Sequence, residues 1–73
     1  SYLIDGEDFE GKIVLNGIHK NIECNIYPFP LRIEDDNNDF YEDEIVLFTA
    51  KSRPNNRDNT KIFWFATNVR LKE

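Results

Sequence analysis

Basic and aromatic side chains follow one another directly in the last third of this 73-residue chain. Residues 51–61 contain four cations and a single acid, and Phe-Trp-Phe occupies residues 63–65. Single-stranded nucleic acids are bound by this combination, because bases stack on aromatic rings while cations follow the phosphate backbone. The pattern predicts a nucleic-acid site formed by Lys51, Arg53, Arg57 and Lys61, with Trp64 beside them. In the alternative interpretation, Phe63 and Phe65 are core residues and the basic segment is a solvated loop.

Catalytic chemistry finds little support in the residue types. His19 is the only histidine, and no Ser, Cys or Asp arrangement for nucleophilic catalysis can be assigned to it, so we expect it to face solvent. Cys24 is the only cysteine and cannot form an internal disulfide. It falls on the apolar side of its segment, where we expect a buried thiol that behaves as a small hydrophobe. We therefore predict a non-enzymatic protein without a cofactor.

An acidic run at residues 34–44 (EDDNNDFYEDE) contains seven acids and no base. Asp35, Asn37 and Asp39 have the 1-3-5 spacing of a calcium loop, but the sixth position is Phe40 instead of glycine. The twelfth position also lacks the required glutamate, so we predict a solvated loop and no metal site. As an alternative, the run mimics nucleic-acid phosphates as an acidic decoy, or docks on a basic partner.

The elements that position these residues are expected to be strands. Alternation of apolar and polar residues is clear along residues 18–27, and a period of two is typical of a half-buried strand. Asn16-Gly17 precedes this segment and predicts a hairpin with a type I′ turn. The expected strands are 11–15, 18–27, 31–33, 45–50 and 61–71, with long loops at 34–44 and 51–60. No helix longer than one or two turns is predicted.

Five strands in so short a chain cannot bury a core as a flat sheet, whereas closure into a barrel encloses the side chains and removes the edges. We therefore predict an all-β fold, a small five-stranded antiparallel barrel of the OB type or, alternatively, the SH3-like type. Residues 1–73 are expected to form one domain, with residues 1–10 as a loose lead-in.

Three short segments follow the pattern of a known family. Residues 42–48 read EDEIVLF, residues 66–70 read ATNVR, and residues 11–14 read GKIV. Together they resemble the cold-shock branch of the OB-fold family. The resemblance implies a barrel, but the family's two aromatic RNP motifs would fall at 22–27 and 31–34, where this chain reads IECNIY and LRIE. The family's nucleic-acid surface is therefore not implied at those positions.

The last two expected strands are apolar on both faces, which predicts a contact surface. We expect the inward residues to be Ile45, Leu47, Phe63, Phe65, Val69 and Leu71, and the outward residues to be Val46, Phe48, Ile62 and Trp64. An exposed apolar patch of this kind marks a contact site for another protein, a neighbouring domain or a second copy in a homodimer. Coverage by the N-terminal residues Tyr2, Leu3, Ile4 and Phe9 is the alternative.

Composition narrows the function classes further. The net charge is −5, with 14 acidic and nine basic residues, which argues against duplex DNA binding through a generally basic surface. The longest apolar run, 62–66, is too short to span a bilayer, and no secretory signal precedes the fold, so we expect no membrane contact and a cytoplasmic or nuclear location. The first expectation is a protein-interaction module in a larger, RNA-associated protein or complex. Single-stranded RNA binding is the second.

Overall fold

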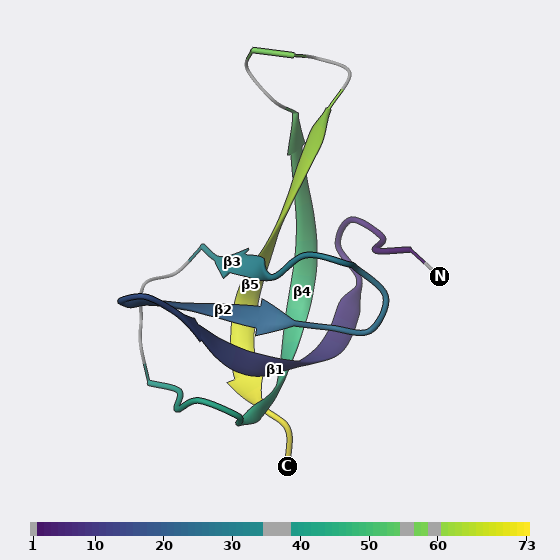
Figure 1. Cartoon of the computed structure of the whole chain (residues 1–73). Coiled ribbons are helices and arrows are strands. Elements are labelled where there is room, and N and C mark those ends of the chain that lie inside the picture. The colour runs from purple at the N-terminus through teal and green to yellow at the C-terminus, as the bar shows by residue number, and fades with distance from the viewer. Residues whose placement is uncertain (1, 35–38, 55–56, 59–60) are drawn as a thin grey trace.

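A computed structural model of the chain describes residues 2–34, 39–54, 57–58 and 61–73. These residues form five strands and, within the described ranges, no helix (Figure 1). The strands are β1 (Asp8–Asn16), β2 (His19–Glu23), β3 (Leu31–Ile33), β4 (Ile45–Pro54) and β5 (Ile62–Leu71). The all-β fold class is confirmed.

The five strands close into a barrel in the order β1-β2-β3-β5-β4, with β1 paired to both β2 and β4. The β3–β5 pair is parallel, and the other pairs are antiparallel. The predicted small five-stranded barrel is thus confirmed and is consistent with an OB-like or SH3-like barrel, but the parallel β3–β5 pair departs from the all-antiparallel pairing that was expected. Closure leaves no long free edge around the body of the sheet.

The first hairpin is present, but its turn is shifted by one residue from the expected position. Asn16 pairs with His19, so the two central turn residues are Gly17 and Ile18. Gly17 has a φ of 64° and Ile18 does not have a positive φ. Positive φ at the first central position alone is typical of a type II′ turn, which requires one glycine. The type I′ prediction centred on Asn16-Gly17 was therefore wrong in register.

The β4–β5 hairpin extends further than expected and projects from the barrel (Figure 1). Pairing continues to Pro54 and Ile62, so Lys51 and Arg53 lie on a strand and not in a loop. The N-terminal segment supports this extension along the other edge of β4. The backbone N–H of Gly6 donates to the carbonyl of Ala50 (2.8 Å), and the N–H of Ser52 donates to the Asp5 carboxylate (2.7 Å). We call residues 51–65 the arm.

Side chains on β4 point in the opposite sense to the prediction. Val46 and Phe48 are fully buried, whereas Ile45 is 42% exposed. The expectation that Val46 and Phe48 face outward was therefore wrong. Alternation separates the two faces of a strand, but it does not say which face is inside when both are apolar.

The same reversal holds in the first half of β5. A bulge then restores the expected orientation at Val69, whereas Leu71, also expected to face inward, is 46% exposed. Ala66 is buried and Trp64 packs partly against the core, whereas Phe63 is 58% exposed. Pairing shifts by one residue between Leu47/Arg70 and Thr49/Thr67, so two β5 residues lie opposite Phe48. One of the two is Asn68, which has a φ of 50°. This bulge re-aims the strand, so Val69 reaches the core as expected.

The core lies inside the barrel and includes part of the N-terminal segment. Its buried members are Leu3, Ile13, Ile22, Cys24, Leu31, Val46, Phe48, Ala50 and Ala66. Phe9 packs on Phe48 with ring centroids 6.1 Å apart. Leu3 and Phe9 therefore belong to the fold, while Tyr2 and Ile4 are exposed. Cys24 is a buried free thiol, as expected.

Candidate nucleic-acid interface

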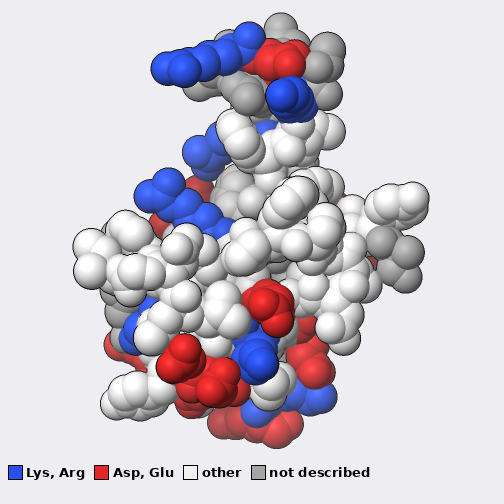
Figure 2. All heavy atoms as spheres, viewed as in Figure 1, with Lys and Arg blue, Asp and Glu red and all other residues white. Residues whose placement is uncertain are grey.

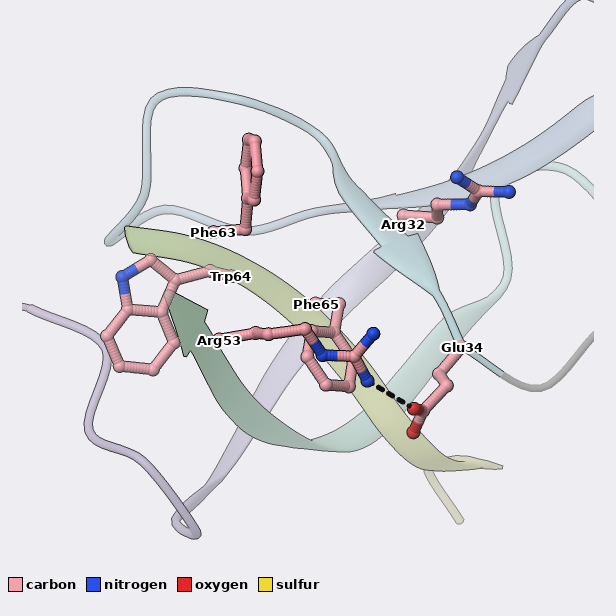
Figure 3. A pocket seen from close by; sticks show the side chains of 6 residues that line it. All are labelled: Arg32, Glu34, Arg53, Phe63, Trp64 and Phe65. Carbon is pink, nitrogen blue, oxygen red and sulfur yellow. Dashed lines mark hydrogen bonds and ion pairs between the residues drawn. The ribbon is translucent and has the colours of Figure 1, made fainter. Parts of the chain in front are cut away.

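A groove opens where the arm leaves the barrel (Figure 3). It has a volume of about 410 Å³. Its lining comes from β3, the residue that follows β3, and the paired strands β4 and β5. The lining residues are Arg32, Glu34, Arg53, Phe63, Trp64 and Phe65.

Strand register brings the cations and rings of this groove together. Arg53 on β4 is paired with Phe63 on β5, and Lys51 with Phe65. Arg32 on β3 is paired with Phe65 from the other side. Directly paired residues of a sheet project from the same face. The outer face of β3, β5 and β4 therefore carries three cations around two aromatic residues.

The aromatic residues of the groove differ in what covers them. The guanidinium of Arg53 lies over the ring of Phe65, 4.7 Å from its centroid, as a cation–π pair. The same guanidinium donates to the Glu34 carboxylate at 3.0 Å (Figure 3). Phe63 stands apart from this pair and is 58% exposed. Trp64 lines the groove and also packs partly against the core. Phe63 is thus the ring that is open for stacking.

Charge is divided unevenly between the arm and the rest of the chain. The arm contains four Lys/Arg residues and one acid, whereas the remaining residues contain five Lys/Arg and thirteen acids. Figure 2 shows basic side chains over the arm and beside its base, and acidic side chains gathered over the opposite end of the barrel. The net charge of −5 therefore does not describe the surface around the groove.

Cations at the far end of the barrel are held by acids. Arg70 lies 2.7 Å from Asp8, and Lys72 lies 2.6 Å from Glu10. Arg32, in contrast, makes no ion pair within the described residues. This difference leaves Arg32 available to an anionic ligand in the groove.

The four cations predicted for the site are all on the arm, but they occupy different places. Arg53 lines the groove, and Lys51 is exposed two residues earlier on the same strand, β4. Arg57 and Lys61 lie in the connection between β4 and β5. Arg32 was not predicted as a site residue. Nothing in its own sequence neighbourhood marks it, because the β3–β5 pairing that places it beside Phe65 joins segments more than thirty residues apart.

The predicted apolar patch is not assembled on the surface. Val46 and Phe48 lie in the core, Ile62 is exposed on the arm, and Trp64 contributes to the groove. His19 is exposed, as expected. Among the residues that the structure describes, no three His, Cys, Asp or Glu side chains gather to hold a metal ion. Asp35 and Asn37 of the calcium-loop comparison lie outside the described residues.

A comparison of the chain with protein-family models, with curated proteins and with solved structures finds no match. Over the described ranges, the chain has no helix with the length and apolar character needed to cross a membrane. The interpretation of the groove depends on the geometry and charge of the chain itself.

Proposed function

We propose that this protein binds single-stranded nucleic acid along the groove and the arm, with RNA as the expected strand. The observation that carries the proposal is the open ring of Phe63 in a groove that it shares with Arg32 and Arg53. A base stacks on the ring while the guanidinium groups bind the neighbouring phosphates. Stacking of this kind needs a base that is free of its duplex partner, which favours a single strand.

Strand order supports the proposal through the fold. The sheet places β4 beside β1, and β1 is followed by β2 and β3, which is the arrangement of a Greek key. OB-folds are five-stranded Greek-key barrels that bind oligonucleotides, and the loop between their fourth and fifth strands takes part in binding. We therefore assign this barrel to the OB type. The corresponding loop of this chain carries Arg57 and Lys61.

The proposed site differs from that of cold-shock domains in the strands that supply its aromatics. Residues 22–27 and 31–34, where the family's RNP motifs would fall, lack its stacking aromatic residues. In this chain the rings come from β5, at Phe63 and Phe65, and β3 contributes Arg32. The proposed binding face therefore lies closer to the arm than the face that cold-shock domains use.

Protein contact through the predicted apolar patch is not proposed, because the side chains of Val46 and Phe48 are buried. The acidic decoy, the homodimer and the intracellular location remain predictions.

The proposal is tested by titrating a labelled oligouridylate of about 12 nucleotides, a length within the site sizes of OB-folds, and following its fluorescence anisotropy. Binding is expected at about 50 mM salt and should weaken steeply toward about 200 mM, because phosphate contacts release counterions. Trp64 is the only tryptophan and lines the groove, so its intrinsic fluorescence should change with the same midpoint. A duplex of equal length should bind more weakly.

The variant Arg32→Glu should reduce affinity roughly tenfold and lower the slope of log K against log salt by about 0.7 for each lost contact. Lys12→Glu makes the same charge change at the opposite end of the barrel, where Lys12 faces Asp43 at 4.0 Å, and should have little effect. Absence of binding at low salt, or an equal loss in both variants, would rule out the proposed site.

A further inference from the structure

We propose that Glu34 is a built-in competitor for the phosphate backbone. In the free protein its carboxylate holds Arg53 over Phe65, and a phosphate of the bound strand takes the place of that carboxylate. This inference rests on the proposed function and concerns the regulation of the same site.

The position of Glu34 is fixed by the fold. It directly follows β3, and its backbone N–H donates to the carbonyl of Ala66 on β5 at 2.9 Å. The side chain is therefore held at the base of the arm, where its Oε1 lies 3.0 Å from the terminal nitrogen of Arg53. Glu34 and Arg53 are 19 residues apart in the sequence, so this contact exists only because β3 lies beside β5 and β5 beside β4.

Arg53 is occupied by two partners at once. Its guanidinium donates to Glu34 and covers the ring of Phe65. Guanidinium groups bind phosphates with the same forked geometry that they use for carboxylates. A phosphate that reaches the groove can therefore exchange with the Glu34 carboxylate without any change in the donor.

Exposure makes this exchange feasible. The side chains of Arg53 and Glu34 are 64% and 50% exposed, so water and salt screen their attraction. Two other lining residues of the groove are not held in this way. Within the part of the chain that the structure describes, Arg32 makes no ion pair and Phe63 has no cation over its ring. Glu34 therefore restrains Arg53, whereas Arg32 is ready to bind an anion.

Release of Arg53 has a second consequence for stacking. When the guanidinium turns toward a phosphate, the ring of Phe65 loses its cover. Phe65 is two residues from Phe63 on the same strand, so the two rings then offer successive stacking positions. Displacement of Glu34 thereby couples backbone binding to the opening of a second base site.

The test compares Glu34→Gln with the parent chain in the oligouridylate titration, and repeats it with an oligoadenylate. Glu34→Gln should raise affinity about fivefold, the most that competition from an exposed ion pair supplies. The increase should be the same for both sequences, because the phosphate is common to them. The salt slope should stay close to that of the parent chain, because both chains contact the same number of phosphates.

Glu10→Gln is the matched control. Glu10 is also half-exposed and also ion-paired, to Lys72 at 2.6 Å, but it lies on β1 away from the groove. Glu10→Gln makes the same change in net charge as Glu34→Gln, and it should leave the affinity and the salt slope close to the parent values. In an Arg53→Ala background, the gain from Glu34→Gln should disappear.

The outcomes separate this inference from the proposed function. If the parent chain binds no single strand, both fail. If the parent binds in an Arg32-dependent manner but Glu34→Gln matches Glu10→Gln, the function stands and the competitor role is overturned. A weaker or base-dependent affinity of Glu34→Gln also overturns it, since Glu34 would then contact a base. Equal thermal unfolding of the variants confirms that folding does not cause the differences.

Discussion

Arg53 and Phe63 are directly paired across β4 and β5, so a cation and an open aromatic ring project from the same face of the arm. The pairing follows from the extension of β4 to Pro54, which brings a basic segment into register with an aromatic one. Neither strand alone forms a binding face, because β4 supplies only the charge and β5 only the rings. The hairpin register therefore creates the Arg53–Phe63 part of the candidate site, and the β3–β5 pairing adds Arg32.

Phe63 and its neighbour Ile62 provide a matched pair for testing that face. Both side chains are 58% exposed, but only Phe63 lines the groove. Phe63→Ala should cost about 1–3 kcal/mol of binding free energy, the range for one base stacked on an aromatic ring. Ile62→Ala should leave affinity unchanged within error. Anisotropy titrations of both variants, with thermal unfolding to check the fold, make the comparison. Equal losses would indicate a general apolar contact in place of stacking.

Val46 and Ile45 test which side of β4 faces the core. Val46 is fully buried and Ile45 is 42% exposed. Val46→Ala removes two buried carbons and should lower the free energy of unfolding by about 2 kcal/mol. Ile45→Ala removes more atoms but should cost less, because its side chain is already partly in water. Urea unfolding measures both values. A larger loss of unfolding free energy for Ile45→Ala than for Val46→Ala would indicate that Ile45, and not Val46, faces the core.

Barrel closure and the approximate places of the five strands could be predicted from the sequence, but several strand ends could not. The strand expected at 18–27 ends at Glu23, and the one expected at 45–50 continues to Pro54. Alternation and the Asn-Gly dipeptide indicate the first hairpin to within one residue, and the short chain length then favours closure. The inward face of β4 could not be predicted in the same way. Both faces of that strand are apolar, so the choice depends on contacts with Phe9, Ile13 and other residues that lie elsewhere in the sequence.

The candidate site was predictable only in part. A basic segment next to an aromatic strand is visible in the sequence, and it includes Arg53. Arg32 and Glu34 were not predicted, because only the parallel pairing of β3 with β5 brings them to the groove. Long-range register of this kind leaves no local pattern. The bulge at Asn68 could not be predicted either, because no residue near it in the sequence marks where the β4–β5 register shifts.

Asn68 carries a prediction about that bulge. Its φ of 50° lies in the left-handed region, which asparagine and glycine tolerate and β-branched residues do not. Asn68→Gly should fold with a stability close to that of the parent chain. Asn68→Val should cost about 1–2 kcal/mol, the strain of one residue forced into that region. Thermal or urea unfolding distinguishes them, and a fully tolerated valine would mean that the bulge is not needed at this position.

Two carboxylates on the N-terminal segment predict how stability depends on pH. Asp8 accepts hydrogen bonds from the Thr49 hydroxyl at 2.6 Å and from Arg70 at 2.7 Å, and these contacts hold its pKa below the ordinary value of 3.8. The backbone N–H and hydroxyl of Ser52 lower the pKa of Asp5 in the same way. Both groups are thus more acidic in the folded chain than in the unfolded chain. Their stabilising contribution is complete above the unfolded value and is lost as pH falls through the lower folded value.

Tm should therefore fall as the protein is acidified from about pH 5 toward about pH 2. Asp8→Asn should lower Tm near neutral pH and flatten this acid dependence, because the titrating group is gone while its neighbours remain. Thr49→Val keeps the carboxylate but removes the donor with the largest effect on its pKa, so the dependence should weaken without vanishing. Thermal unfolding followed by far-UV circular dichroism over this pH range measures Tm for the parent chain, Asp8→Asn and Thr49→Val. An Asp8→Asn profile that runs parallel to the parent profile would show that the Asp8 contacts with Thr49 and Arg70 do not stabilise the barrel.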